Sequence, residues 1–322
     1  MSGETFVALC GGIGGAKLAL GLDRVLPPGA LTVIVNTGDD FEHLGLHVSP
    51  DIDTVIYTLA GLANPEAGWG LGGETWSFMA ALERLGGPTW FRLGDGDLAT
   101  HVERTRRLRN GDRLSDVTAD LARALGVTAR VLPMSDDPVR AVVETDEGPL
   151  PFQHYFVARA CKPRVQAISF EGAAAARLAK PAAAALADRR LAGIIICPSN
   201  PYLSVDPLLA VPGLREATRA SGAPVIAVTP LIGGKAVKGP TAKIMAELGL
   251  EASVRAIVRH YDGLIDGFVL DEADAELAGD IAVPVQVTNT LMRTLADRVA
   301  LANATLAFCR TLAHRAAVEK RA

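Results

Sequence analysis

The sequence predicts an α/β protein whose core is one doubly wound, mostly parallel sheet. Short apolar, β-branched runs alternate with amphipathic helical runs along most of the chain, which is the order of a parallel sheet covered by helices on both faces. A glycine-rich turn directly follows the first apolar run, as in Rossmann-like folds. Between residues 139 and 189 the pattern changes to short alternating strands and an alanine-rich helix. We therefore expect a smaller α+β subdomain at 139–189, inserted into a nucleotide- and ligand-binding core formed by residues 1–138 and 190–322.

Composition indicates a folded globular protein. Of the 322 residues 49% are hydrophobic and 21% are charged, a balance that supports a large core and argues against disorder. The net charge is −4, and the densest basic cluster, residues 104–109, is typical of the solvated face of a helix, so we expect no nucleic-acid partner. No apolar run reaches the roughly 18 residues of a membrane span, and a signal-peptide pattern is absent. With four widely spaced cysteines, these features predict a cytoplasmic protein that has free thiols and no membrane partner.

The first unit of the fold is a strand, a glycine loop and a helix. Residues 5–10 are expected to form a buried strand, and residues 18–26 an amphipathic helix that ends before two prolines. The loop between them, Gly11-Gly-Ile-Gly-Gly-Ala-Lys17, leaves the backbone N–H groups of a helix N-terminus free to hold a phosphate. It departs from the dinucleotide fingerprint because Lys17 stands where the third glycine belongs, and it lacks the Lys-Ser/Thr pair of a P-loop. A tight turn without a ligand is the alternative.

The second unit carries four acidic side chains at the same end of the sheet. Residues 31–36 are expected to be a buried strand that ends in Thr-Gly-Asp-Asp. Nine residues further on, Ser49 suits the N-cap and Pro50 the first position of a helix that runs to about residue 62. The aspartates are Asp39 and Asp40 after the strand, and Asp51 and Asp53 in the first turn of the helix. Because open α/β sheets bind ligands beyond the carboxyl ends of their strands, we expect a cation or phosphate-transfer site here.

Geometry limits how many of these carboxylates share one ion. Adjacent residues on an extended segment point opposite ways, and residues two apart on a helix differ by roughly 200°. At most one of Asp39 and Asp40, and one of Asp51 and Asp53, is therefore expected to face an ion directly. Histidines and cysteines are too scattered for a transition-metal site, so the expected cation is hard and oxygen-liganded, such as Mg²⁺. Stabilising the helix dipole is the alternative role for Asp51 and Asp53.

The rest of the chain continues the alternation. Further strands are expected at residues 89–93, 127–132, 193–197, 224–228, 266–270 and 282–287, and further helices at residues 74–85, 98–109, 115–125 and 291–312. Several strand ends carry polar loops rich in glycine or proline, such as residues 94–97, and this shared composition is expected of a crevice that binds a phosphate-bearing ligand.

Other polar residues have two interpretations each. His43 and His47 have the spacing of a metal pair, but Gly45 argues against a helix there, and we expect no zinc site. His101 and Arg104 are expected to anchor the loop before their helix, with a phosphate contact as the alternative. Lys235 and Lys238 lie beside glycines and are candidates to balance phosphate charge. The alternative is that both lysines are simply solvated.

Several motifs occur together in this chain. They include Gly11-Gly-Ile-Gly-Gly-Ala-Lys17, Val35-Asn-Thr-Gly-Asp-Asp40, Val48-Ser-Pro-Asp-Ile-Asp-Thr54, Trp90-Phe-Arg-Leu-Gly-Asp95, Pro198-Ser-Asn-Pro201 and Pro230-Leu-Ile-Gly-Gly-Lys-Ala-Val-Lys-Gly-Pro240. In this order, from residue 6 to about residue 270, the chain resembles the 2-phospho-L-lactate transferase family of coenzyme F(420) biosynthesis.

The resemblance implies a reaction, a metal and a set of site residues. The reaction is Mg²⁺-dependent transfer of a phospholactyl-type group, from phospholactate, phosphoenolpyruvate or phosphoglycerate, out of a guanosine-diphospho donor. The acceptor is the ribityl hydroxyl of the deazaflavin Fo, and GMP is released. The resemblance implies that the metal is bound by Asp39 or Asp40 together with Asp51 or Asp53. It implies catalytic roles for Asp53 and Asp40. Contacts to the deazaflavin are implied for Asp53 and Arg92. Nucleotide contacts are expected at Gly12, Gly14, Gly15, Lys17, Ser199, Asn200, Gly234 and Lys238. Gly96 stands where we expect a basic side chain, and a homodimer is the plain expectation for a soluble enzyme.

Two other functions are compatible with parts of the sequence. An NAD-dependent oxidoreductase would use an acid at the end of the second strand, Asp39 or Asp40, to bind a ribose, but the broken fingerprint at Lys17 counts against it. A regulator of the same fold would bind a sugar nucleotide or dinucleotide without turnover. The run from Trp90 to His101, together with Asp53 and Arg92, favours the transferase.

Overall fold

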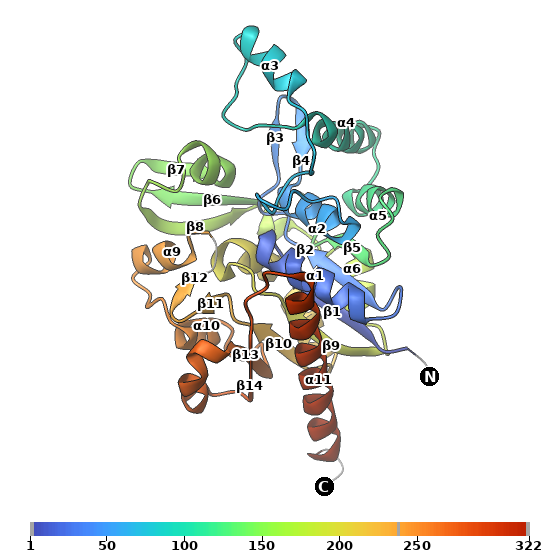
Figure 1. Ribbon diagram of the computed structural model, residues 1–322, viewed down its shortest axis with the longest axis vertical. Coiled ribbons are helices and arrows are strands. Elements are labelled where there is room, and N and C mark those ends of the chain that lie inside the picture. The colour runs from blue at the N-terminus through green and yellow to red at the C-terminus, as the bar shows by residue number, and fades with distance from the viewer. Residues whose placement is uncertain (1–2, 237–238, 320–322) are drawn as a thin grey trace.

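A seven-stranded sheet lies at the centre of the computed structural model, which describes residues 3–236 and 239–319 (Figure 1). Its strands are β1 (Thr5–Cys10), β2 (Leu31–Val35), β5 (Arg130–Pro133), β9 (Leu191–Ile196), β10 (Val225–Val228), β13 (Gly267–Asp271) and β14 (Val285–Thr288). They are paired in parallel throughout, in the order β14-β13-β10-β9-β1-β2-β5. This arrangement confirms the predicted doubly wound α/β class.

Hydrophobic clusters fill the space on both faces of the sheet. Alternate strand residues point to opposite faces, so Val7 and Leu9 of β1 belong to one cluster and Phe6 and Ala8 to the other. On the face of Phe6 lie α1 (Gly12–Val25), α2 (Pro50–Ala60), α5 (Leu114–Ala124) and α11 (Leu295–Glu319). On the face of Val7 lie α6 (Lys180–Leu186), α7 (Asp206–Ala210), α8 (Leu214–Ala220), α9 (Thr241–Glu247) and α10 (Val254–His260). Burial of both faces explains why the strands read as continuous apolar runs.

The strand order reverses between β1 and β9, and this reversal places the ligand crevice. From β1 the chain adds β2 and β5 on one side, and from β9 it adds β10, β13 and β14 on the other. The loops that leave β1 and β9 therefore diverge at their carboxyl ends. Gly11 and Ser199 face each other across this point.

A separate antiparallel sheet follows β5, as the alternating pattern predicts. It consists of β6 (Arg140–Thr145), β7 (Gly148–Pro151) and β8 (Val165–Glu171) in the order β7-β6-β8. A π-helix, His154–Ala158, connects β7 to the segment before β8. Val143 and Val165 belong to the same hydrophobic cluster as residues of the main sheet, so the two sheets share a core. The division of the chain at residues 139 and 189 stays a prediction.

Smaller elements complete the edge of the crevice. A hairpin of β3 (Phe41–His43) and β4 (Leu46–Val48) follows β2, and α3 (Ser77–Arg84) and α4 (Asp95–Arg109) lie beyond it (Figure 1). A second hairpin joins β11 (Leu231–Ile232) to β12 (Lys235–Ala236), and a second π-helix spans Pro201–Val205. Short 3-10 turns occupy Ala173–Ala175 and Glu272–Asp280. Among the described residues, no helix combines the length and the apolar character required to cross a bilayer.

Three local expectations are wrong. The predicted loop at residues 11–17 is mostly helical, because α1 begins at Gly12. Residues 89–93 form no strand; instead Trp90 and Phe91 pack their rings against Phe41 of the β3–β4 hairpin at 6.0 and 4.8 Å between centroids. The apolar character of that run therefore comes from an aromatic cluster and not from a sheet. Finally, α4 begins at Asp95, so most of the predicted loop 94–97 is helical.

The basic cluster at residues 104–109 also differs from expectation. Arg104 is fully buried, with 0% of its surface exposed, although the pattern predicted a solvated face. The reason is the partner it finds on α2, which sequence spacing does not reveal.

Candidate active site

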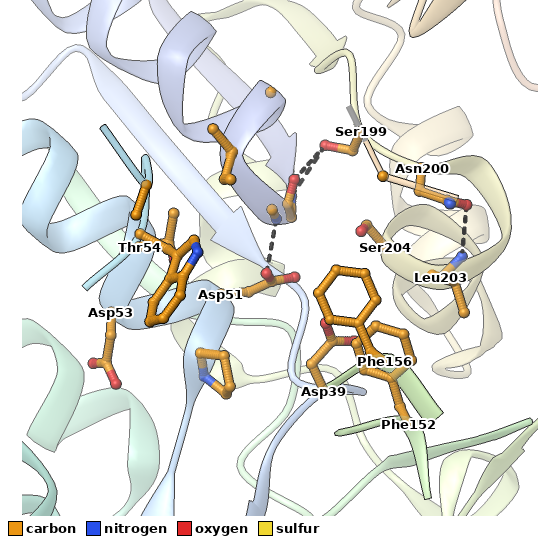
Figure 2. Close-up of a pocket in the computed structure, with 18 of the residues that line it drawn as sticks. Asp39, Asp51, Asp53, Thr54, Phe152, Phe156, Ser199, Asn200, Leu203 and Ser204 are labelled. Carbon is orange, nitrogen blue, oxygen red and sulfur yellow. Dashed lines mark hydrogen bonds between the residues drawn. The ribbon is translucent and has the colours of Figure 1, made fainter. Parts of the chain in front are cut away.

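A cavity of about 650 Å³ lies beyond the carboxyl ends of β1, β2 and β9 (Figure 2). Its size matches that of sites for small organic ligands. The walls come from the start of α1, the loop after β2, the start of α2, the segment after β9 and both π-helices. π-Helical turns are enriched at functional sites. The cavity has a polar end at α1, and aromatic side chains line other parts of its wall.

The start of α1 is packed closely against the segment after β9. Ser199 Oγ donates a hydrogen bond to the Gly11 carbonyl at 2.7 Å and accepts one from the Gly11 N–H at 3.2 Å. A Cβ on Gly14 would lie 2.3 Å from the Pro198 carbonyl oxygen, and one on Gly15 would lie 2.7 Å from Ser199 Oγ. The glycines are thus required by close packing. That packing leaves the helix N-terminus open to the cavity, where it is suited to bind an anion.

Asp39 and Asp51 form an acidic pair on the cavity wall. Asn36 Nδ2 donates to Asp39 Oδ1 and to Asp51 Oδ2, each at 2.9 Å. The other oxygen of Asp51 accepts the Gly12 N–H at 2.8 Å. Burial raises the pKa of Asp51 to about 6, and burial together with the nearby Asp51 charge raises the pKa of Asp39 well above its usual range. The N–H groups that bind these carboxylates are neutral and do not compensate their negative charge. A hard divalent cation, which prefers oxygen ligands, therefore fits between Asp39 and Asp51.

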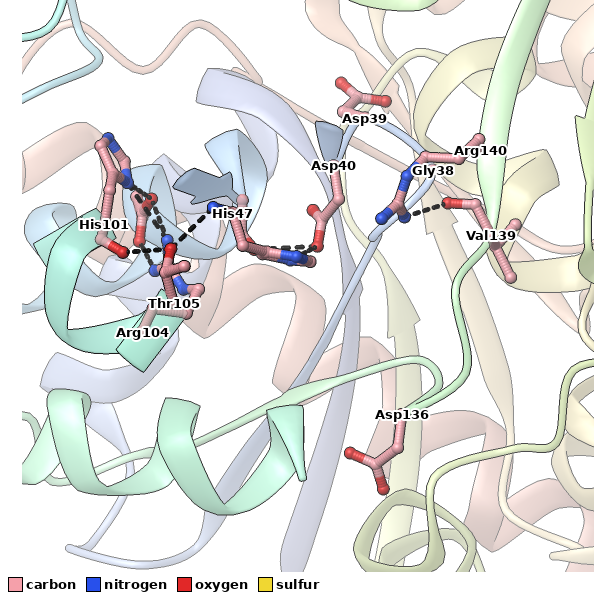
Figure 3. A network of polar contacts seen from close by, with 12 residues as sticks. Gly38, Asp39, Asp40, His47, His101, Arg104, Thr105, Asp136, Val139 and Arg140 are labelled. Atoms are coloured by element: carbon pink, nitrogen blue, oxygen red, sulfur yellow. Dashed lines mark hydrogen bonds and ion pairs between the residues drawn. The ribbon is translucent and has the colours of Figure 1, made fainter. Parts of the chain in front are cut away.

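Asp40 points away from Asp39 and has other partners (Figure 3). Its Oδ2 accepts the Ser49 hydroxyl at 2.8 Å and lies 3.0 Å from His47 Nε2. The predicted divergence of Asp39 and Asp40 is therefore confirmed, and Asp40 does not line the large cavity. Ser49 does occupy the N-cap position of α2, but its hydroxyl binds Asp40 and makes no cap hydrogen bond. Asp40 thus ties the loop after β2 to the start of α2.

Asp53 projects from α2 away from Asp51 (Figure 2) and binds Arg104 of α4. Arg104 Nη1 donates to Asp53 Oδ2 at 3.0 Å, and Arg104 Nη2 donates to Asp53 Oδ1. Burial raises the pKa of Asp53, and the guanidinium opposes that rise. Nearby, the Tyr57 hydroxyl donates to Asp97 Oδ1 at 2.7 Å. Asp53, Tyr57 and Asp97 all line the cavity.

Aromatic side chains line much of the cavity. They are Trp69, Trp90, Phe152 and Phe156, of which Trp69 and Phe156 are 53% and 39% exposed. Phe152 and Phe156 stack at 5.3 Å between ring centroids and lie beside Asp39 (Figure 2). Arg92 also lines the cavity, with its guanidinium 4.2 Å above the ring of Trp76. Such rings are suited to bind a flat heteroaromatic ligand.

The structure brings most of the predicted site residues to this cavity. It is lined by Gly12, Gly14, Lys17, Asp39, Asp51, Asp53, Arg92, Ser199 and Asn200. Gly15 and Asp40 lie behind that wall, and Gly234 lies in the β11–β12 turn, outside the lining. Lys238 lies outside the described residues.

Sequence reasoning missed several contributors. Asn36 was not singled out as the amide that joins Asp39 to Asp51, although it ends the same strand. The aromatic wall from Phe152 and Phe156 had no signal beyond an apolar i, i+4 pair.

Comparison with known proteins decides the family. The family model described as 2-phospho-L-lactate transferase CofD matches residues 6–303. The chain belongs to the 2-phospho-L-lactate transferase family. It is 43% identical over 298 residues to a phosphoenolpyruvate transferase of Streptomyces griseus, covering 88% of this chain and 93% of that protein. It is 38% identical over 308 residues to the 2-phospho-L-lactate transferase of Methanocaldococcus jannaschii, covering 94% and 98%.

Solved structures support the fold. A member of the UPF0052 family from Bacillus halodurans superimposes with a TM-score of 0.62 at 16% identity, covering 95% of this chain and 99% of that one. The family assignment makes the chain a transferase of coenzyme F(420) biosynthesis that moves a phospholactyl or phosphoenolpyruvyl group. The family assignment therefore favours the transferase over the oxidoreductase and the regulator.

Proposed function

We propose that this transferase moves a phospholactyl-type group from a guanosine-diphospho donor to the ribityl hydroxyl of the deazaflavin Fo and releases GMP. The observation that carries the proposal is a single cavity whose wall combines two kinds of surface. A helix N-terminus and an acidic pair form part of it, and aromatic rings with Arg92 form another part. A diphosphate suits the first kind of surface and a flat ring system the second.

The polar end is the proposed site of the donor. Backbone N–H groups at the start of α1 are placed to bind phosphate oxygens, and Ser199 and Asn200 line the opposite wall. Lys17 lines the same end, with its ammonium 3.1 Å from the Met292 carbonyl. Asp39 and Asp51 would hold Mg²⁺, which when bound neutralises charge on a diphosphate.

The proposed reaction is a substitution at phosphorus. A bond forms between the ribityl oxygen of Fo and the phosphorus that bears the three-carbon group. The bond from that phosphorus to the bridging oxygen breaks, and GMP leaves with that oxygen. Asp53 would accept a hydrogen bond from the ribityl hydroxyl, orient it, and take its proton as the new bond forms, passing that proton on to solvent, with Arg92 against the ring. Asp40 would act through Ser49 and the start of α2, since it lies behind the wall.

Mass spectrometry of the product tests this function. The purified protein is incubated with Fo, Mg²⁺ and, in turn, the guanosine-diphospho derivatives of phospholactate, phosphoenolpyruvate and phosphoglycerate. We expect one of them to give the corresponding Fo adduct together with equimolar GMP. No adduct from any of the three, with a protein that is folded by circular dichroism, would refute the proposal.

A further inference from the structure

Among the arginine, aspartate and glutamate side chains of α4, only that of Arg104 is buried, and the proposed reaction gives it no role. It is wholly buried and does not line the cavity. A buried guanidinium is costly unless a carboxylate both pairs with it and accepts its hydrogen bonds. Arg104 satisfies this requirement with Asp53, which does line the cavity.

The pairing fixes the Asp53 carboxylate. Each of its oxygens accepts a hydrogen bond from a different nitrogen of the Arg104 guanidinium. A bidentate pair of this kind sets both the position and the plane of the carboxylate. Figure 3 shows Arg104 beside His101 on α4, well separated from Asp39 and Asp40.

The competing interpretation is that the acidic cluster around Asp53 is a metal centre. Asp53, Asp97 and His101 each place one donor atom within 4.8 Å of the others. However, Arg104 Nη1 lies 3.3 Å from His101 Nδ1, and the guanidinium is always a donor. A neutral His101 therefore carries its proton on Nε2, the nitrogen 3.4 Å from Asp97. A protonated nitrogen does not bind a metal, and the guanidinium would repel a cation, so this cluster is not a metal centre.

We propose that Arg104 is a positioning residue that acts through Asp53. By engaging both oxygens, it holds Asp53 in one orientation toward the acceptor and keeps it from joining a cation at Asp39 and Asp51. The identity of the acceptor rests on the proposed function. The placement of Arg104 is independent of it.

The test compares binding of Fo with binding of GDP. Fo binding is followed by its fluorescence and GDP binding by calorimetry, for wild type, Arg104→Gln, Arg104→Lys, Asp53→Asn and the double variant Asp53→Asn/Arg104→Gln. We expect Arg104→Gln to weaken Fo binding at least tenfold and GDP binding less than twofold, with partial rescue by Arg104→Lys, which keeps the charge but not the fork. The double variant should bind Fo no more weakly than Asp53→Asn, because Arg104 acts through that residue.

Arg106→Gln is the matched control, since Arg106 lies on the same helix but pairs with Glu103 at the surface. It should leave both affinities unchanged. The double variant leaves no buried charge unpaired. If Arg104→Gln does not fold, Arg104→Lys and the double variant still show whether Fo affinity falls more than GDP affinity. Equal loss of Fo and GDP binding, or unchanged Fo binding in Arg104→Lys and Arg104→Gln, would overturn the positioning role alone. Wild-type protein that binds GDP but not Fo would overturn the proposed function and with it this inference.

Discussion

Asp51 is the residue at which the sheet, the first helix and the second helix meet. It lies in the first turn of α2, accepts the Gly12 N–H of α1 and accepts Asn36 at the end of β2. Support of its own helix N-terminus was the alternative role, but its hydrogen bonds go to other elements. Asp51 therefore links the anion-binding end of α1 to the acidic pair.

The pKa of Asp51 predicts how stability depends on pH. Burial raises this pKa from 3.8 to about 6, so the folded protein holds the proton more tightly than the unfolded chain. The stabilisation from protonation is complete below about pH 4 and is lost as the pH rises through 6. In EDTA, we expect the melting temperature to fall between pH 5 and pH 7. Added Mg²⁺, which binds the ionised form, should reduce that fall.

Asp51→Asn is the control for this titration, because it removes the ionisable group. The pH dependence between 5 and 7 should be flatter in the variant, and Mg²⁺ should change it less. An identical pH profile in wild type and variant would show that Asp51 does not titrate in this range.

Arg92 provides a prediction about ligand selectivity. Its guanidinium lies over Trp76, and Arg92 lines the cavity. Arg92→Ala should raise the KM for Fo by about tenfold or more, the scale of a lost stacked or charge-assisted contact, with little change in the KM for the donor. Steady-state kinetics with each substrate varied in turn measure both values. Equal increases would mean that Arg92 supports the wall as a whole.

At the scale of elements, α1 and α11 pack so closely that a glycine is needed at their contact. A Cβ on Gly21 would lie 2.1 Å from the Arg298 carbonyl oxygen of α11, a distance that backbone cannot accommodate without a shift. In an exposed helix, alanine would be favoured over glycine by about 1 kcal/mol. At Gly21 the steric cost of the added Cβ is larger than this gain, so alanine is expected to destabilise the protein.

Gly21→Ala is therefore expected to destabilise the protein by about 1–3 kcal/mol, the usual cost of overpacking. Chemical denaturation measures the change. Gly279→Ala is the control, since nothing lies within 4 Å of the added Cβ at that position. It should change stability by less than about 0.5 kcal/mol. A neutral Gly21→Ala would mean that α11 moves away from α1 at little cost.

At the scale of the whole molecule, the reversal of strand order determines where the cavity lies and where the two proposed substrates would meet. The elements after β1 and after β9 come from distant parts of the sequence, yet both line one cavity. The proposed cation lies where they converge, with two cavity-lining carboxylates to hold it. Mg²⁺ bound by so few carboxylates usually needs substrate phosphates as further ligands.

We therefore expect Mg²⁺ or Mn²⁺ to be required for turnover and to bind weakly until the diphosphate donor is present. Activity assays in excess EDTA, followed by metal titration, measure the requirement. Calorimetric titration of Mg²⁺ with and without GDP measures the coupling. Full turnover in excess EDTA would contradict the prediction.

Local sequence patterns alone determined most of the secondary structure and one end of the site. The buried strands at 5–10 and 31–36 were predicted because short apolar, β-branched runs favour a sheet interior, and the structure has them at 5–10 and 31–35. Asp39, Asp40, Asp51 and Asp53 were predicted to gather beyond the carboxyl ends of the strands, but which member of each pair faces the cavity was left open. The divergence of Asp39 from Asp40 also followed from local geometry.

Only the tertiary structure decided which acidic side chain has which partner. Asp53 binds a guanidinium 51 positions away, and the contact depends on how α4 packs on α2, which no short-range pattern encodes. For the same reason the burial of Arg104 against α2 was not predicted, and Trp90 and Phe91 were expected in a strand before their packing on Phe41 was known. Hydrophobic periodicity shows which face of a helix or strand is buried. It does not show which other element packs against that face, and ion pairs and aromatic clusters depend on that packing.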